Sequence, residues 1–95
     1  IGFITYTFDD IGAEIHNIYI SPIVRRRRFG KTLCMHALER LKIIGKRTVT
    51  VWLVEGRTQV IKFYKSIGFT ETDDFRHDKI SEDILLLERR FVISV

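Results

Sequence analysis

A basic run that ends at a glycine is the part of this sequence whose residue types point most directly to chemistry. The run reads RRRRFGKT and consists of Arg25, Arg26, Arg27, Arg28, Phe29, Gly30, Lys31 and Thr32. A helical pattern begins here, and the first backbone N–H groups of a helix have no partner within the helix. Those groups, the helix dipole and the arginine side chains all attract anions. Residues 25–32 are therefore predicted to bind a phosphate or a pyrophosphate.

Two well-known phosphate-binding motifs do not fit this run. The dinucleotide motif G-x-G-x-x-G requires glycines that the run lacks. The nucleotide motif G-x-x-x-x-G-K-[ST] matches only at its end, in Gly30-Lys31-Thr32, because Arg25 stands five positions before Gly30. The predicted anion site therefore depends on the basic loop and the helix start alone.

Proton-carrying side chains occur upstream of the basic run. Glu14 and His16 stand two positions apart in a predicted strand, so they share a face of the sheet unless a bulge intervenes. Cys34 falls on the apolar stripe of the predicted helix and is interpreted as a small buried hydrophobe. His36 and His77 have no metal-ligand spacing with other residues, and no metal site is predicted.

Positive charge is concentrated in one segment. Residues 23–47 hold nine basic residues and one acid, within a chain whose net charge is +4. Such a segment attracts a polyanion, which leaves nucleic acid, an anionic membrane surface and a phosphorylated cofactor as candidates. A plain solvated face is the alternative interpretation.

Length and composition limit the class of protein. With 95 residues, 45% of them hydrophobic, the chain is predicted to form a single domain over residues 1–95 with its own core. One cysteine excludes an internal disulfide, and no apolar run reaches the roughly 18–20 residues of a membrane span. We therefore expect a cytoplasmic protein without membrane partners. Because the chain begins with Ile1, it is interpreted as a possible fragment, processed form or trimmed version.

The surrounding pattern predicts elements that alternate between strand and helix. The fold class is a mixed α/β or α+β layer, in which helices cover a sheet. Residues 76–83 are predicted to be a loop, and the last apolar run also fits a buried helix. The predicted order is a strand at Gly2–Phe8, a strand at Glu14–Ile20, a helix from Gly30 to a Gly45 cap, a strand at Thr48–Val54, a helix at Arg57–Ile67 capped by Gly68, a strand from Phe69 to near Phe75, and a strand at Asp83–Ile93.

Two partial motifs in this order resemble the GNAT superfamily of acyl-CoA-dependent N-acetyltransferases. The first reads IHNIYISP-IV-RRRRFG-KTLCMHALERLK, with Arg25 and Gly30 at family positions and Arg28 in place of the usual first glycine. The second reads RTQVIKFYKSIGF. In it Phe63, Tyr64, Gly68 and Phe69 match, whereas Arg57 replaces an asparagine and Val60 an alanine. The resemblance spans about residues 2–93 and implies a mixed, mostly antiparallel sheet with two main helices.

The resemblance also implies a reaction and a site. Family members bind acyl-CoA between two central strands that splay apart, which here are the strands near Ile18–Ser21 and Trp52–Val54. The backbone of Tyr19 and Ile20 would pair with the pantetheine amides, and the amides of residues 25–32 would hold the pyrophosphate. Tyr64 matches the tyrosine that commonly protonates the leaving thiolate. A neutral primary amine would attack acetyl-CoA directly in a ternary complex.

The general base and the acceptor are less defined. Family strands often carry an acid near Glu14, which makes Glu14 the preferred base over His16. The acceptor is an amine of a small molecule, a polyamine or a protein. An acidic group in and beside the last predicted loop fits a cationic acceptor or a solubilising loop, and it comprises Asp73, Asp74, Asp78, Glu82 and Asp83.

Two other functional classes stay open. Arg28 and Arg57 at usual motif positions are compatible with an inert GNAT-like interaction module that binds CoA. A small basic nucleic-acid binder is disfavoured because Trp52, Phe63 and Tyr64 are interpreted as core residues. The chain is short for the family and lacks the strands and helices that usually come first. An open sheet edge would then favour pairing with a second copy, so a homodimer is a hypothesis.

Overall fold

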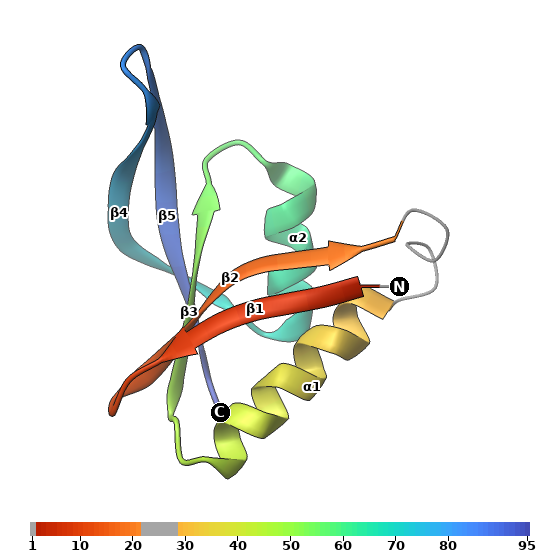
Figure 1. The fold of residues 1–95 in the computed structure, drawn as a ribbon. Coiled ribbons are helices and arrows are strands. Elements are labelled where there is room, and N and C mark those ends of the chain that lie inside the picture. The colour runs from red at the N-terminus through yellow and green to blue at the C-terminus, as the bar shows by residue number, and fades with distance from the viewer. Residues whose placement is uncertain (1, 22–28) are drawn as a thin grey trace.

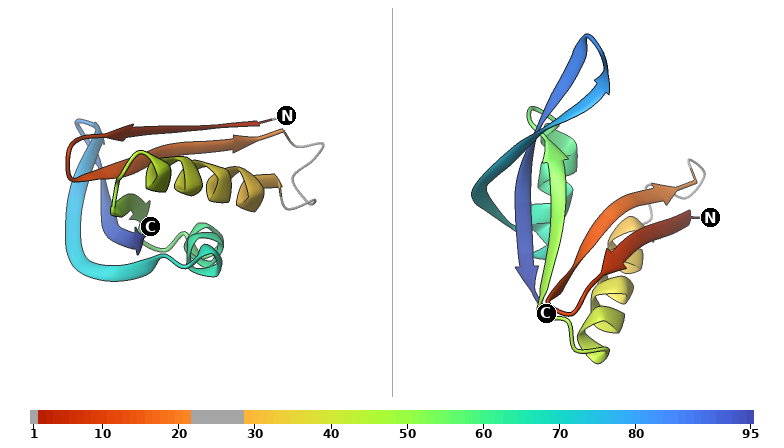
Figure 2. Two further views of the ribbon diagram at one scale, coloured as in Figure 1. Left: turned by 90° about the horizontal axis from the view of Figure 1, so that it is seen from below. Right: turned by 60° about the vertical axis from the view of Figure 1, so that its left-hand side comes forward.

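In the part of the chain that the structure describes, five strands form one sheet, and two helices lie on the same side of it (Figures 1 and 2). The computed structural model describes residues 2–21 and 29–95. Neither of the two helices in this part of the chain is long and apolar enough to cross a membrane. The elements are β1 (Gly2–Phe8), β2 (Gly12–Ile20), α1 (Phe29–Ile43), β3 (Thr48–Val54), α2 (Thr58–Ile67), β4 (Thr70–Ser81) and β5 (Ile84–Ser94).

The sheet is mixed and mostly antiparallel, as predicted. Its strand order is β1-β2-β3-β5-β4. Among the strands of the described residues, the β2–β3 pair alone is parallel, because α1 carries the chain back across the sheet between these two strands. The β1–β2, β3–β5 and β4–β5 pairs are antiparallel.

The core lies between the sheet and the two helices. Val49, Val51 and Leu53 alternate along β3 and are buried, so they point to the face that the helices cover. Each such aliphatic side chain contributes about 1.5–3 kcal/mol when it is removed from water. We call this side the helix face and the opposite side the open face. The other residues of the buried cluster are Ala13, Ile15, Cys34, Leu38, Leu41, Tyr64, Phe69 and Phe91.

A β-bulge interrupts β2 at its midpoint. Thr5 of β1 pairs with Asn17, whereas the next residue, Tyr6, pairs with Ile15, so His16 is the extra residue. Asn17 Nδ2 donates to Thr5 Oγ1 at 3.3 Å, and His16 Nε2 lies 2.8 Å from Thr7 Oγ1. Thr5 and Thr7 share the open face of β1. Their contacts show that the bulge places two consecutive side chains of β2, His16 and Asn17, on that same face.

Both helices end at the predicted glycines. Gly45 has φ 89° after α1, and Gly68 has φ 122° after α2. The amide of Lys46 donates to the Leu41 carbonyl, and that of Phe69 donates to the Tyr64 carbonyl, so both helix ends are closed by backbone hydrogen bonds. A side chain on Gly68 would also lie 3.2 Å from Ile93 Cδ1.

The prediction of a loop over residues 76–83 is wrong. β4 continues to Ser81 and forms a long hairpin with β5. Cross-strand pairs hold the polar stretch in place, including an ion pair of 2.9 Å between Arg76 Nε and Glu88 Oε1. A polar sequence therefore forms a strand here because its partner strand is apolar and adjacent.

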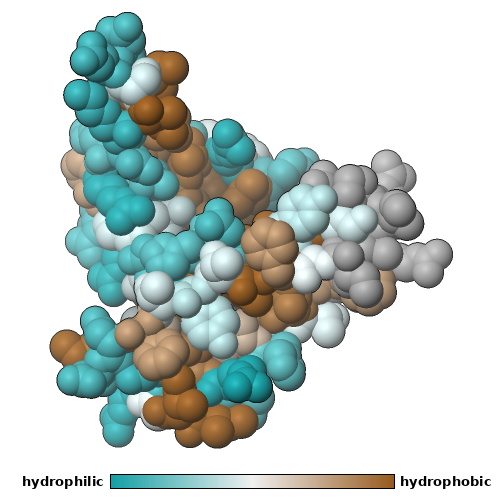
Figure 3. All heavy atoms as spheres, in the orientation of Figure 1, coloured by the Kyte–Doolittle hydropathy of each residue, from teal (hydrophilic) through white to brown (hydrophobic). Residues whose placement is uncertain are grey.

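The end of this hairpin projects beyond the rest of the molecule (Figure 1). Apolar side chains gather along one side of the projection (Figure 3). Phe75 is 58% exposed and Leu85 is 61% exposed, and Ile80, Ile84 and Leu87 are exposed as well. The hairpin therefore presents an apolar strip that the described residues leave uncovered.

Candidate functional site

β2 and β3 separate beyond a short parallel contact. Their register covers only Gly12–Ile15 against Thr48–Val51. Beyond this contact β2 continues from His16 to Ile20 beside β1, and β3 continues from Trp52 to Val54 beside β5. The predicted splay between the two central strands is confirmed by this register.

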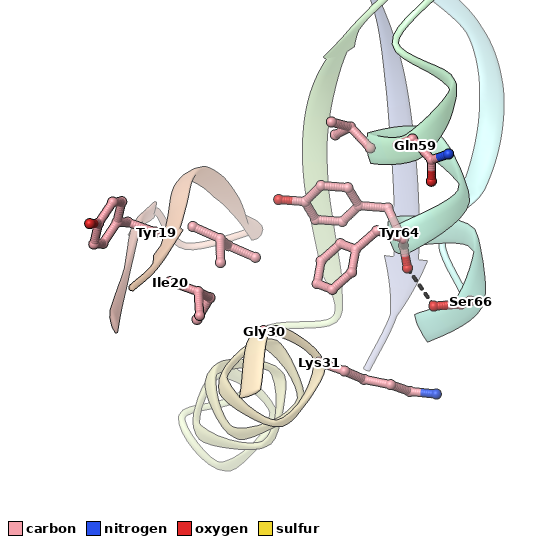
Figure 4. A pocket seen from close by; sticks show the side chains of 10 residues that line it. Tyr19, Ile20, Gly30, Lys31, Gln59, Tyr64 and Ser66 are labelled. Atoms are coloured by element: carbon pink, nitrogen blue, oxygen red, sulfur yellow. Dashed lines mark hydrogen bonds between the residues drawn. The ribbon is translucent and has the colours of Figure 1, made fainter. Parts of the chain in front are cut away.

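A cavity of about 790 Å³ lies in the gap, and we call it the splay pocket. The walls come from the end of β2, the start of α1 and one side of α2 (Figure 4). Apolar side chains dominate the lining, and polar groups stand at its edge. The lining residues are Ile18, Tyr19, Ile20, Gly30, Lys31, Gln59, Val60, Phe63, Tyr64 and Ser66.

The first turn of α1 forms one wall of the splay pocket. Phe29, Gly30, Lys31 and Thr32 all lie in this turn, which contains no acidic residue. The free N–H groups of the turn and the Lys31 ammonium therefore give this wall a positive potential. Lys31 extends outwards past the end of α2 in Figure 4. Arg25, Arg26, Arg27 and Arg28 lie outside the described residues.

Gly30 makes the floor of the pocket close-fitting. A Cβ atom at this position would lie 3.4 Å from Phe63 Cε1 and 3.6 Å from Ile20 Cγ1. These are ordinary van der Waals distances, so an alanine fits, whereas a longer side chain would enter the pocket. This limited space explains why the family pattern has glycine or alanine at the position of Gly30.

Tyr64 points from α2 towards the gap between β2 and β3 (Figure 4). Its ring packs edge to face against Phe63 and Phe69, with centroids at 5.1 and 5.3 Å. Only 6% of the residue is exposed. Among residues 2–21 and 29–95 its hydroxyl has no hydrogen-bond partner. Burial, with a smaller effect from Cys34, raises the pKa of Tyr64, so the hydroxyl keeps its proton.

Cys34 lies behind Tyr64 in the core and is fully buried. Burial raises the pKa of its thiol to about 11. The interpretation of Cys34 as a small buried hydrophobe is confirmed by this placement. Phe63 is partly buried and packs against the core cluster, whereas Trp52 is half-buried outside it, so the prediction of a core residue is wrong for Trp52.

Glu14 and His16 lie on the open face, as their spacing predicted. His16 Nδ1 is 3.2 Å from Glu14 Oε2. Glu14 lines a second cavity of about 480 Å³, the face pocket, which does not include Tyr64. The two predicted catalytic residues therefore stand on opposite sides of the sheet. The face pocket is lined by Thr7, Phe8, Asp9, Ile11, Gly12, Ala13, Glu14, Thr48, Thr50, Trp52 and Arg90.

Several lining residues were not predicted from the sequence. Arg90 Nε donates to Thr50 Oγ1 at 3.1 Å, and Arg90 Nη1 lies 3.0 Å from Asp74 Oδ2. Gln59 and Ser66 line the splay pocket from the outer side of α2. Their helical spacing relative to Phe63, which follows Gln59 by four residues and precedes Ser66 by three, gives a signal for the α2 residues, but no local signal marks Arg90. In the part of the chain that the structure describes, no cluster of His, Cys, Asp and Glu is arranged to hold a metal ion.

The model of the acetyltransferase (GNAT) family matches residues 1–69. The chain belongs to this family. An uncharacterized N-acetyltransferase of Methanocaldococcus jannaschii is 39% identical over 61 residues, which is 64% of this chain and 27% of that protein. The chain thus spans about a quarter of the length of this curated relative.

Solved structures share the fold. Ard1 from Thermoplasma volcanium superposes with a TM-score of 0.85 at 21% identity, over 100% of this chain and 63% of that one. An acetyltransferase of Bacillus subtilis in complex with CoA gives a TM-score of 0.81 at 20% identity, over 99% of this chain and 68% of that one. At these identities the likeness shows the GNAT fold.

Proposed function

We propose that this chain transfers an acetyl group from acetyl-CoA to a primary amine by direct attack in a ternary complex. The splay pocket is the observation that carries the proposal, because an apolar channel there ends at the positive first turn of α1. Membership of the GNAT family supports the class of reaction. The Bacillus subtilis structure of the same fold contains CoA, which supports the co-substrate.

The pantetheine arm fits the β2 side of the splay pocket. Tyr19 and Ile20 line this side, and the Tyr19 ring turns away to stack on Phe3 with centroids 5.4 Å apart. The backbone of the strand is therefore the part of Tyr19 nearest the ligand. Amide groups of the arm would pair with this strand in the manner of an added strand.

The phosphates fit the α1 end of the pocket. The N–H groups of Phe29, Gly30 and Lys31 are the first in the helix and have no helical acceptor, and Thr32 follows them. We assign them the pyrophosphate, together with Arg25, Arg26, Arg27 and Arg28 of the basic run. Each arginine can offer two parallel N–H groups to a phosphate.

The chemistry takes place where the strands part. The nitrogen of a neutral amine attacks the thioester carbon, the C–N bond forms, and the carbonyl oxygen becomes an oxyanion. When the C–S bond breaks, the thiolate receives the Tyr64 proton, and the amide nitrogen returns a proton to Tyr64. Since burial makes Tyr64 a weaker acid than a thiol, the second transfer must accompany the first. A base, which the sequence assigns to Glu14, first takes a proton from the ammonium form.

Calorimetry and a thiol-release assay test the proposal together. CoA is expected to bind with micromolar affinity, and acetyl-CoA should release thiol in the presence of some member of a panel of small amines, polyamines and peptides. Gly30→Leu, which fills the pocket floor, should abolish CoA binding, whereas the matched variant Gly30→Ala should retain it. The absence of any heat with CoA at low salt contradicts the proposal.

The same panel separates the alternatives. CoA binding without thiol release for any amine would instead indicate an inert interaction module. A salt-sensitive, sequence-indifferent gel shift stronger than CoA binding would favour the nucleic-acid binder.

A further inference from the structure

Among the described strands, β4 is the last in the sheet, and no other described element lies along its outer edge (Figure 1). Its pairing with β5 is irregular between Glu71 and Phe75 and again between Lys79 and Ser81. The regular stretch between these two irregularities is Phe75–Lys79, which we call the β4 edge, and all of its residues are exposed. An edge of this kind offers unpaired backbone N–H and C=O groups to another chain.

The β4 edge also carries charged side chains with unused bonding capacity. Arg76 Nε donates to Glu88 Oε1 at 2.9 Å, and its guanidinium lies 4.4 Å from the centre of the Trp52 ring. In the described part of the chain, the two Nη atoms of Arg76 have no hydrogen-bond partner, and the side chains of Asp78 and Lys79 form no ion pair or hydrogen bond. Arg76 and Asp78 share one face of the strand, because they stand two positions apart.

Only one register lets two copies of this edge pair with unlike charges opposed. Two copies related by a two-fold axis pair antiparallel, and directly opposed residues must share a face, so a residue lies on the axis. With Arg76 or Asp78 on the axis, identical charges oppose each other. With His77 on the axis, Arg76 of each copy opposes Asp78 of the other. This register also pairs the whole stretch Phe75–Lys79 with itself.

The same register joins the apolar strips of the two hairpins. His77 is opposite Leu87 of β5, and Lys79 is opposite Leu85, so these four side chains share one face of the hairpin with Phe75. Both leucines and Phe75 are exposed on the projecting part of the hairpin, where apolar side chains gather (Figure 3). Across the axis, Lys79 of one copy would lie beside the Phe75 ring of the other, which favours a cation–π contact. An exposed apolar patch of this kind is typical of an interaction surface.

From this complementarity we infer that the chain forms a symmetric homodimer through β4, in which two sheets join into one continuous sheet with His77 on the axis. The helices do not obstruct this approach, because both lie on one side of the sheet and away from the projecting hairpin (Figures 1 and 2). No residue of the β4 edge lines the splay pocket, so the inference does not depend on acetyl transfer. Charges on an edge strand normally oppose pairing between chains, and here they select a single register.

Cysteine cross-linking tests the register directly. Opposed residues in an antiparallel pair have Cα atoms about 4.5–5.5 Å apart, which is within disulfide range. His77→Cys is therefore expected to give a covalent dimer under mild oxidation, visible on a non-reducing gel. Lys79→Cys is the matched control, because its two copies would lie roughly 13 Å apart, four residues along the strand. The wild type gives the background, since its cysteine, Cys34, is buried.

Sedimentation equilibrium tests the charge pairing without any cross-link. The wild type should form a reversible dimer at high micromolar concentration. Asp78→Arg should weaken the dimer about tenfold or more, because both symmetry-related pairs change from attraction to repulsion. Asp83→Arg makes the same change of charge in the hairpin turn, outside the β4 edge, and should leave the association unchanged. Circular dichroism of each variant confirms that the fold is kept.

Three results would each overturn the proposed interface. The first is a wild-type protein that stays monomeric at the highest soluble concentration. The second is cross-linking of His77→Cys that is no faster than that of Lys79→Cys. The third is a dimer that Asp78→Arg leaves intact, which would show that the two copies associate through another surface.

Discussion

Tyr64 joins two properties that a proton donor needs. Aromatic contacts with Phe63 and Phe69 fix the ring, and its hydroxyl faces the gap where the strands part. Burial keeps the proton on the oxygen at any working pH, because the pKa of Tyr64 is raised. The residue is therefore suited to protonating a leaving group and unsuited to acting as a base.

Tyr64→Phe is expected to lower kcat for acetyl transfer about 100-fold, because a general acid contributes roughly 10²–10⁴-fold. The affinity for CoA should change less than threefold, since the ring and its packing remain. Steady-state kinetics and calorimetry on the same preparation measure both. Tyr6→Phe, at a partly buried tyrosine of β1, serves as the control and should change neither. Equal losses in kcat and CoA affinity would contradict a proton-transfer role.

Cys34 should be chemically inert in the folded protein. With its thiol pKa raised to about 11, roughly one molecule in a thousand carries a thiolate at pH 8. Labelling with iodoacetamide at pH 8 should be negligible until denaturant is added, and mass spectrometry detects the adduct. Because folding favours the neutral thiol, wild-type stability relative to Cys34→Ala should fall as pH rises from about 8.5 to 11. Rapid labelling of the native protein would show that Cys34 is accessible.

At the scale of elements, two glycines that look alike in the sequence differ in what they permit. Gly68 has φ 122° and faces Ile93 at close range, so an added side chain meets both backbone strain and a contact of 3.2 Å. Gly30 is helical, and a Cβ there meets only ordinary contacts. Gly68 is required by its backbone conformation, whereas Gly30 is required to be small because its position borders the splay pocket.

Gly68→Ala should therefore lower the free energy of unfolding by about 1 kcal/mol or more, the usual range for strain at a left-handed position. Gly30→Ala should be neutral or slightly stabilising, because alanine favours the helix by roughly 0.8–1 kcal/mol. Chemical denaturation of the two variants beside the wild type provides the comparison. A larger loss in Gly30→Ala than in Gly68→Ala would contradict the geometry at both sites.

Local patterns predicted the elements whose own residues decide their structure. The β-branched run of β3 and the amphipathic α2 follow directly from composition and spacing. β4 was only half predicted, because Arg76, His77 and Asp78 have no strand pattern of their own. They are extended because Glu88, Leu87 and Leu86 of β5 stand opposite them. Such pairing is not visible in a local window.

The residues of the candidate site likewise fall into those that local sequence predicted and those that depend on strand pairing. The β2–α1 wall of the splay pocket was predicted because its motif is contiguous in sequence, as were Tyr64 and the Glu14–His16 face. Arg90 was missed, since it joins the face pocket only because β5 is inserted between β3 and β4. Thr7 was missed because its contact with His16 depends on the register between β1 and a bulged β2.

At the scale of the whole molecule, the chain separates its charge by function. Five of the basic residues in segment 23–47 precede or lie in the first turn of α1 beside the splay pocket, namely Arg25, Arg26, Arg27, Arg28 and Lys31. The face pocket is bordered by Glu14 and by Asp9, and Lys46 contacts Asp9. In the proposed reaction the donor is an anion and the acceptor's ammonium group a cation, so the two ligands are expected at different faces of one sheet.

This separation predicts that CoA binding depends on salt and on the arginines before α1. Raising the salt concentration from about 0.05 to 0.5 M should weaken CoA binding several-fold, because salt screens the attraction between the basic residues and the phosphates of CoA. Arg25→Ala and Arg28→Ala should each weaken CoA more than a pantetheine fragment that lacks the phosphates. Calorimetry with both ligands provides the comparison, and Arg40→Ala, at the far end of α1, is the control. Equal losses for both ligands would refute the assignment of these arginines to the phosphates.

The bulge in β2 has a consequence for insertions and deletions. Before it, alternate residues Ala13 and Ile15 point to the helix face; after it, the even-numbered Ile18 and Ile20 line the splay pocket. β2 is in effect two half-strands of opposite phase joined at His16. Deleting His16 would remove the phase change. The side chains of either Gly12–Ile15 or Asn17–Ile20 would then have to point to the opposite face of the sheet. A single-residue deletion here should therefore be far more damaging than any substitution at the same position, because it turns Tyr19 into the pocket and Ile18 and Ile20 out into water.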